Sequence, residues 1–347
     1  MQYTTASETD LFLSLTPEKV LAAVEAGGLK CNPVCYPLNS FENRVYEVEL
    51  ADRTRVVAKF YRPGRWSEEQ ILEEHRFLED LAAEEIPVCT MRPFPGGGTL
   101  RRIEDILYSL SDRRGGRAPD ELDEPTARRL GMLVGRMHNV AIQRESRHRV
   151  RLDADTYIRE DLDWLEDHDV LPRHLKERYF DAALAIATIT DRRLAGVPVH
   201  RVHGDLHLGN ILFRDGLLRV LDFDDMVVGP AVQDLWLALP GRDSYTQTLR
   251  ERFLEGYTQF RDFDRSTLSL IEVLRGMRVI HYAAWLSRRW HDPAFPLAWP
   301  HFGTPDYWER ETQDLEEQLA VIRGEATPEE AEARLTEESI QEEEPAL

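Results

Sequence analysis

The 347-residue chain has few cysteines, no long apolar run and a shortage of basic residues. Its three cysteines, Cys31, Cys35 and Cys89, lack metal-site spacing. No apolar run approaches a membrane span, and residues 1–10 lack the basic start and apolar core of a signal peptide. We therefore expect reduced thiols in a cytoplasmic protein that does not enter a membrane.

The chain is strongly acidic, with a formal net charge of −20. This charge disfavours broad electrostatic binding to nucleic acid or to anionic membranes. Part of the excess is local, because nine glutamates and one arginine lie between Glu325 and Leu347. We expect an acidic, disordered tail over residues 324–347, and a regulatory tail is the alternative interpretation.

The first hundred residues favour strands, with one main helix. Alternation over residues 44–50, a β-prone run at 54–60 and the pair Asp52-Arg53 between them predict a hairpin. Ser67 with Gln70 forms a capping-box pattern that begins a helix ending near Ala83. A further β-prone run covers residues 103–110.

The chain becomes helical beyond a polar, glycine-bearing segment at residues 111–117. Helical patterns begin at Glu124 and cover residues 176–189 and 268–290, whereas residues 199–220 favour loops and short strands. We expect an α+β fold of two lobes. The divisions are an antiparallel-sheet N-terminal lobe at 1–110, a connector at 111–117, a larger, mostly helical lobe at 118–323 and the tail at 324–347.

The most informative stretch is residues 203–212, which read HGDLHLGNIL, followed by LDFD at residues 221–224. Asp205 and Asn210 are spaced as in the kinase loop H-R-D-L-x-x-x-N, and Asp222 begins a D-F-D where kinases have D-F-G. Asp205 is suited to accept the proton of an acceptor hydroxyl, while Asn210 and Asp222 supply oxygen ligands for Mg²⁺. The pattern predicts magnesium-assisted phosphoryl transfer from ATP to a hydroxyl.

Two histidines and one further aspartate near this loop allow more than one interpretation. His203 and His207 could be zinc ligands, but no third ligand of a usual zinc pattern follows, so we expect His203 to brace the loop through a hydrogen bond. Asp234 is a candidate to brace the same loop through backbone N–H groups; a helix-surface aspartate is the alternative.

The N-terminal lobe offers candidate nucleotide contacts. Lys59 ends a Val-Val-Ala strand, as the phosphate-contacting lysine of kinases does, and Glu73 and Glu74 are its candidate helix partners. Residues 38–44 occupy the place of the kinase glycine-rich loop without containing a glycine. The Ser40 hydroxyl and backbone N–H groups there could meet phosphates, or the segment could be a simple hairpin turn.

These motifs resemble the aminoglycoside phosphotransferase superfamily, which has a protein-kinase-like fold. Residues 15–322 resemble more narrowly the bacterial stress response kinase A family, through PLNSFENRVY at 37–46, VAKFYRP at 57–63, GPAVQDLW at 229–236 and DPAFP at 292–296. The helix pattern of the superfamily favours Glu74 over Glu73.

The resemblance implies a cytoplasmic, monomeric, ATP- and Mg²⁺-dependent Ser/Thr protein kinase in a bacterial stress response. It implies Asp205 as proton acceptor, Asn210 and Asp222 as magnesium ligands, Asp222 as a further active-site residue and Ser40 as an ATP contact. Lys59 and Glu74 complete the expected ATP site.

The chain departs from eukaryotic kinases where Gly204 replaces the arginine of H-R-D and Asp224 replaces the glycine of D-F-G. The short span from Asp222 to Gly229 excludes an ordinary activation segment, so we expect no switch by loop phosphorylation. A small hydroxylated metabolite or an aminoglycoside is the alternative acceptor, with a pocket walled by Trp285, Trp290 and Trp299. A catalytically dead nucleotide-binding protein is a third hypothesis, which the complete motif set disfavours.

Overall fold

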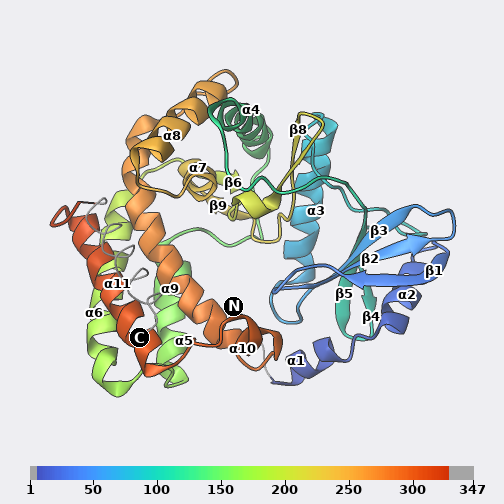
Figure 1. The fold of residues 1–347 in the computed structure, drawn as a ribbon, viewed down its shortest axis with the longest axis horizontal. Coiled ribbons are helices and arrows are strands. Elements are labelled where there is room, and N and C mark those ends of the chain that lie inside the picture. Colours follow the sequence, from blue (N-terminus) through green and yellow to red (C-terminus); the bar gives the residue numbers. More distant parts are fainter. Residues whose placement is uncertain (1–5, 328–347) are drawn as a thin grey trace, which may run out of the picture.

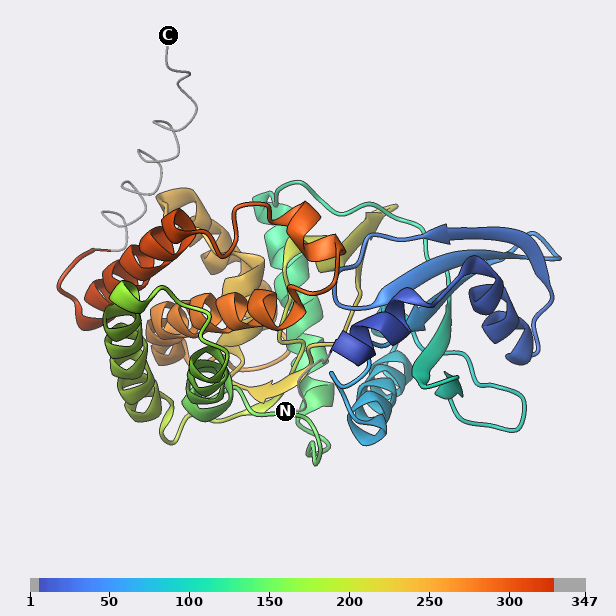
Figure 2. The ribbon, with the colours of Figure 1, turned by 90° about the horizontal axis from the view of Figure 1, so that it is seen from below.

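The computed structural model describes residues 6–327, so most of the acidic tail lies outside the described residues. A sheet-containing N-terminal part and a larger helical C-terminal part lie side by side, with helix α3 (Glu68–Ala83) at their junction (Figures 1 and 2). This arrangement confirms the expected α+β fold. Among the described helices, none combines the length and apolar character that crossing a bilayer demands.

The N-terminal part is built on a five-stranded antiparallel sheet in the order β1-β2-β3-β5-β4. The predicted hairpin is confirmed as β2 and β3, and Asp52 accepts a hydrogen bond from the Thr54 N–H (3.0 Å) in its turn. The run at 103–110 is not one strand, because the chain turns at Glu104 with a positive φ of 52°. The strands are β1 (Cys31–Pro37), β2 (Arg44–Leu50), β3 (Arg55–Phe60), β4 (Arg101–Ile103) and β5 (Ile106–Asp112), preceded by helices α1 (Ala6–Leu13) and α2 (Pro17–Ala26).

Helix α3 begins with the expected capping box. The Gln70 N–H donates to Ser67 Oγ (3.3 Å), and the Ser67 N–H donates to Gln70 Oε1 (2.9 Å). The sheet has its own apolar core with α2, whereas Phe77 of α3 belongs to the core of the C-terminal part and meets Phe223 edge-on at 5.7 Å. Helix α3 therefore packs against the C-terminal part, while its Glu74 lies 3.7 Å from Lys59 of the sheet.

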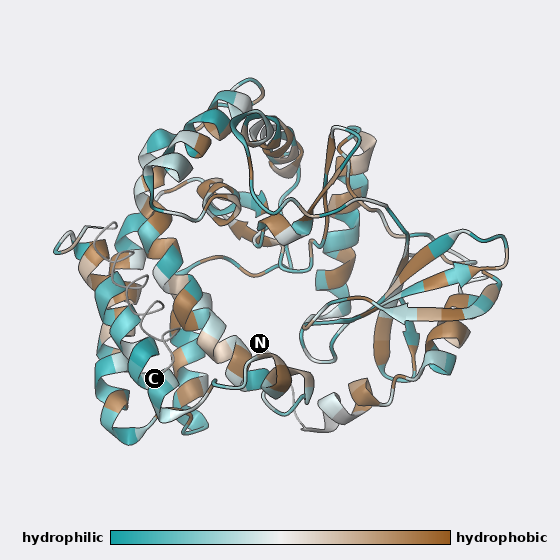
Figure 3. Ribbon diagram, in the orientation of Figure 1, coloured by the Kyte–Doolittle hydropathy of each residue, from teal (hydrophilic) through white to brown (hydrophobic). Residues whose placement is uncertain are grey.

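The described C-terminal part consists of helices around two short strand pairs, β6 with β9 and β7 with β8, and turns. Figure 3 shows both hydrophobic and hydrophilic residues along most of these helices, as expected when one face packs inward. The helix expected at 176–189 is longer than predicted, and the one expected at 268–290 begins as a 3₁₀ turn. The helices are α4 (Glu124–Ala141), a π-helical turn η1 (Asp155–Arg159), α5 (Glu160–Asp167), α6 (Arg173–Leu194), α7 (Val232–Ala238), α8 (Ser244–Tyr257), α9 (Ile271–Arg289), α10 (Ala294–Ala298) and α11 (Pro305–Arg323), with 3₁₀ turns η2 (Leu208–Asn210) and η3 (Arg265–Leu270). The strands are β6 (His200–Val202), β7 (Ile211–Arg214), β8 (Leu217–Val220) and β9 (Val227–Gly229).

Helices α4 and α8 pack backbone to backbone through two glycines. A Cβ added to Gly131 would lie 1.9 Å from the carbonyl oxygen of Phe253, and one added to Gly256 would lie 1.9 Å from that of Arg128. This close approach brings the Tyr257 hydroxyl to His138 Nδ1 (2.9 Å). The glycines therefore set the position of a histidine that contacts the site described below.

We expect Gly131→Ala to lower the free energy of unfolding by about 1–3 kcal/mol, because the added methyl group overpacks the α4–α8 contact. Helix propensity alone would favour alanine by about 1 kcal/mol, so the clash sets the sign. Denaturant unfolding measures the change. Arg128→Ala, on the exposed side of α4, is the control and should stay within about 0.5 kcal/mol. An unchanged or stabilised Gly131→Ala protein would contradict the packing described.

Candidate active site

The loop between β6 and β7 is held by side chains that bond to its backbone. Asp234 accepts hydrogen bonds from the N–H groups of His203 (2.9 Å) and Gly204 (3.0 Å), which confirms the expected brace. His138 Nε2 lies 3.0 Å from the same carboxylate. His203 Nε2 donates to the Leu221 carbonyl (2.7 Å), so this histidine also braces the loop as expected. The loop geometry is therefore fixed by buried, satisfied polar groups.

Gly204 is required where kinases carry the arginine of H-R-D. Its φ is +86°, a region that L-residues rarely adopt, and an added Cβ would lie 2.1 Å from the carbonyl oxygen of Asp225. A side chain at this position would push the loop away from the segment after Asp222. The departure from the kinase pattern thus has a steric reason.

Asp205 lies on this loop with its carboxylate between the side chains of Arg278 and His207. Arg278 Nη1 of α9 is 2.9 Å from Oδ1, and His207 Nε2 is 3.4 Å from Oδ2. Burial acts to raise the pKa of Asp205, but the His207 hydrogen bond and the charge of Arg278 outweigh it and hold the pKa well below its usual value. Asp205 is therefore ionised at neutral pH and can accept a proton.

Asn210 and Asp222 are placed together by a backbone bond between their segments, since the Leu221 N–H donates to the Asn210 carbonyl (2.8 Å). Asn210 Nδ2 donates to the Asp205 carbonyl (2.9 Å), and its amide oxygen bonds to no other group within residues 6–327, so it can coordinate a cation. Asp222 has a strained φ of +52°, and its side chain is about half exposed. This pair of hard oxygen donors fits a magnesium ion chemically.

Lys59 reaches from β3 into a group of three carboxylates. Its Nζ is 3.0 Å from Asp222, 3.0 Å from Asp224 and 3.7 Å from Glu74. Burial opposes the charged amine, but these carboxylates outweigh it and raise the pKa of Lys59 well above its usual value. Burial also raises the pKa of Glu74 to about 7, since Lys59 offsets only part of that cost.

The two candidate helix glutamates have different roles. Glu74 lies beside Lys59 and also meets Arg149 Nη2 (3.1 Å), as the superfamily pattern favours. Glu73 instead accepts hydrogen bonds from the backbone N–H groups of residues 147–149 at 2.7–2.9 Å. Glu73 thus fixes the segment that carries Arg149.

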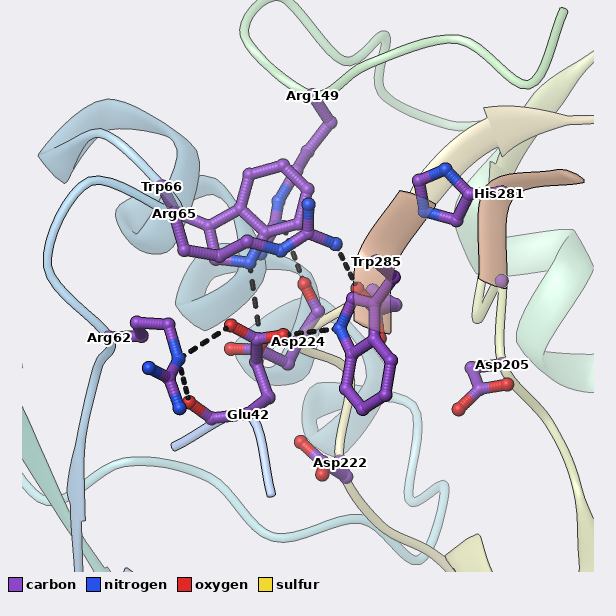
Figure 4. Close-up of polar contacts among 12 residues, drawn as sticks. Glu42, Arg62, Arg65, Trp66, Arg149, Asp205, Asp222, Asp224, His281 and Trp285 are labelled. Carbon is purple, nitrogen blue, oxygen red and sulfur yellow. Dashed lines mark hydrogen bonds and ion pairs between the residues drawn. The ribbon is translucent and has the colours of Figure 1, made fainter. Parts of the chain in front are cut away.

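Three side chains hold the D-F-D-D segment that begins at Asp222 (Figure 4). Trp66 Nε1 donates to Asp224 (3.3 Å), Arg65 donates to Asp225 (2.8 Å), and Arg149 Nη1 donates to the Asp224 carbonyl (2.6 Å). Burial opposes ionisation of Asp224, yet Lys59 and Arg149 lower its pKa to about 2. The contacts of Trp66, Arg65 and Arg149 therefore stabilise the D-F-D-D segment directly, without the help of an activation loop.

Ser40 lies in the loop of residues 38–43 between β1 and β2, and this loop touches the C-terminal part. Trp285 Nε1 donates to the Glu42 carboxylate (2.6 Å), and Arg289 pairs with it at 2.7 Å. Trp285 and Trp299 lie 5.8 Å apart, whereas Trp290 packs on Phe302 instead. Two of the three tryptophans expected in a pocket wall therefore lie together.

Sequence reasoning did not assign roles to Arg149 or Arg278, although both contact the expected site residues. No local pattern marks them: Arg149 lies in an irregular segment, and Arg278 lies within a helix that carries no recognisable motif. Charge balance is the one indication that such arginines exist. Carboxylates that are buried, as Glu74 and Asp224 are, need cationic partners from elsewhere in the chain.

The fold and this loop arrangement define a kinase-like phosphotransferase. The model of the phosphotransferase enzyme family matches residues 35–271, and the chain therefore belongs to this family. Among individual relatives, stress response kinase A of Escherichia coli (strain K12) is 40% identical over 315 residues, covering 90% of this chain and 95% of the relative. The serine/threonine protein kinase RdoA of Salmonella typhimurium (strain LT2) is 38% identical over 314 residues, covering 90% and 94%.

Solved structures share the fold at lower sequence identity. An amicoumacin kinase in complex with AMP-PNP and Ca²⁺ aligns with a TM-score of 0.70 and 20% identity, covering 89% of this chain and 96% of that one. A microcompartment-associated aminopropanol kinase aligns with a TM-score of 0.65 and 18% identity, covering 87% and 96%. The two-lobed fold is thus the one used by kinases of small molecules as well.

We expect Arg278→Met to raise the pKa of Asp205, because the variant removes a positive charge that favours the carboxylate. The base is active when ionised, so the acid limb of kcat/KM should move to higher pH. Initial rates of phosphoryl transfer from ATP across the acid range measure this shift.

The control is Arg275→Met, one turn earlier on α9, where the arginine pairs with Glu272 at 3.3 Å. Its acid limb should match that of the wild type. Equal acid limbs for Arg278→Met and the wild type would show that Arg278 does not act on Asp205.

Proposed function

We propose that this protein is an ATP- and Mg²⁺-dependent kinase that transfers the γ-phosphoryl group to Ser/Thr hydroxyls of a protein. The observation that carries the proposal is the assembly of Asp205, Asn210, Asp222 and Lys59 around one loop pair. We place it in the bacterial cytoplasm, as a monomer that takes part in a stress response. The family resemblance and the names of the relatives support this assignment.

In this proposal Asp205 accepts a hydrogen bond from the acceptor hydroxyl and takes its proton as the oxygen attacks. Asn210 and Asp222 would hold the magnesium ion, which neutralises charge on the phosphates. Lys59 leaves Asp222 to contact the α- and β-phosphates, while Asp224 and Glu74 keep its amine in place. Ser40 contacts the phosphates from the loop between β1 and β2. The nucleotide lies between the lobe at 1–110 and the lobe at 118–323.

A small hydroxylated acceptor is the second candidate function. It is favoured by the short span between Asp222 and β9, which begins at Val227 and leaves little platform for a peptide. Tyr282, Trp285 and Trp299 form an aromatic group near α10 that could hold such a molecule, with Tyr282 and Trp285 stacked at 5.5 Å. The named substrates of the structurally similar kinases fit the same interpretation.

The test compares the rate of phosphoryl transfer by the wild type and by Asp205→Asn, each incubated with γ-labelled ATP and Mg²⁺. Loss of the proton acceptor should lower transfer by about 10²- to 10⁴-fold. Asp215→Asn is a matched control, because Asp215 is exposed and has a φ of +52°, a region that asparagine also tolerates. The control should retain the wild-type rate.

The acceptor is identified in the same assay. Label recovered as phosphoserine or phosphothreonine, on the protein itself or on a generic protein substrate, supports a protein kinase. Label found only on aminoglycosides or amino alcohols supports the second function. Transfer that does not depend on Asp205 with any acceptor would refute both.

A further inference from the structure

The loop of residues 38–43 has no glycine, yet a buried arginine organises its backbone. Arg62, just after β3, has a fully buried side chain. Its Nε donates to the carbonyl of Glu42 (2.9 Å), and its Nη2 donates to the carbonyl of Phe41 (3.0 Å). The Arg62 N–H also donates to the Asn43 side chain (3.1 Å). One residue thus contacts three consecutive positions of the loop.

These two bonds fix the orientation of two consecutive peptide planes. In a planar trans peptide the C=O and the following N–H point in opposite directions, and no described peptide bond is cis. The carbonyls of Phe41 and Glu42 face Arg62, so the N–H groups of Glu42 and Asn43 face away from it. Neither N–H donates a hydrogen bond to any protein group within residues 6–327.

A carboxylate from the opposite lobe holds Arg62 in this position. Asp292, between α9 and α10, is buried and lies 2.9 Å from Arg62 Nη2. Arg44 of β2 contacts the same carboxylate at 2.8 and 3.0 Å. Helix α10 and the loop come together in both ribbon views (Figures 1 and 2). Although Arg62 Nη1 has no hydrogen-bond partner within residues 6–327, the two bonds to carbonyls and the ion pair with Asp292 hold the guanidinium in one geometry.

The loop lies where a phosphate ligand would be bound. It occupies the place of the kinase loop that covers ATP phosphates. Figure 4 shows Glu42 between Arg62 and the aspartates Asp222 and Asp224, and the latter two contact Lys59. Adjacent backbone N–H groups that point in a common direction make an anion site.

We propose that the N–H groups of Glu42 and Asn43 bind the distal phosphates of ATP, and that Arg62 is the positioning residue that sets their orientation. Glycine-rich loops reach such an orientation through backbone freedom. Here a buried guanidinium, anchored on Asp292, imposes it on residues that lack this freedom. The proposal rests on ATP being the phosphoryl donor, as proposed above.

The test is the affinity of Arg62→Lys for ATP relative to AMP, measured by calorimetry. Lysine keeps the charge but loses the planar fork that contacts two carbonyls and Asp292 at once. ATP affinity should fall about tenfold, because the loss of one hydrogen bond to a charged group lowers affinity by about that factor. AMP affinity should stay within about twofold, because AMP lacks the distal phosphates. General destabilisation would instead weaken both ligands alike.

Arg44→Lys is the matched control. Arg44 contacts the same Asp292 but its side chain bonds to no carbonyl of the loop, so the ATP-to-AMP ratio should match that of the wild type. If Arg62→Lys does not fold, Asp292→Asn tests the proposal instead. The ratio of its ATP affinity to its AMP affinity should fall as well, by a smaller factor.

Two results would overturn the inference. One is a folded Arg62→Lys protein, or a folded Asp292→Asn protein where that variant decides, with an unchanged ratio. The other is a wild type that uses ATP but binds it no more tightly than AMP. A wild type that binds no ATP at all would refute the proposed function itself, so the two failures are distinguishable.

Discussion

The site depends on one electrostatic constraint: three carboxylates share a single buried ammonium group. Lys59 lies within 3.0–3.7 Å of Asp222, Asp224 and Glu74, which come from both parts of the chain. Because one positive charge cannot balance the buried carboxylates of Asp224 and Glu74 together with the half-exposed Asp222, further cations must reach the same place. Arg149 supplies one by bonding both Glu74 and the carbonyl of Asp224. The relative position of sheet, helix α3 and the D-F-D-D segment follows from this balance.

The same constraint explains how the chain dispenses with an activation segment. A longer segment would need its own interactions to hold Asp222, whereas here Trp66, Arg65 and Arg149 hold Asp224 and Asp225. Gly204 allows the segment to approach the catalytic loop, and Asp234 fixes that loop from behind. These contacts hold the segment through unmodified side chains.

Features that depend on residues close together along the chain could be predicted from the sequence. The capping box at Ser67, the hairpin of β2 and β3 and the loop that carries Asp205 and Asn210 were all expected from short motifs, as was the brace by Asp234. The turn at Glu104 was missed because the β-prone residues on both sides suggested one continuous strand, although Glu104 and Asp105 themselves disfavour strands. Arg278, Arg149 and the Arg62–Asp292 pair join positions that are 73 to 230 residues apart, and no local pattern reports such contacts.

Arg278 bears on the choice between the two acceptor classes. An acceptor hydroxyl must donate to Asp205 while Arg278 remains 2.9 Å from the same carboxylate, or else displace it. A cationic acceptor brought close to Asp205 would be repelled by this arginine, and the repulsion offsets the attraction of the acidic surface. A neutral Ser or Thr hydroxyl pays no such cost and can use the remaining lone pairs of the carboxylate. The arrangement therefore favours an acceptor hydroxyl without a nearby positive charge over an amino alcohol, and an acidic group next to that hydroxyl would be attracted by Arg278.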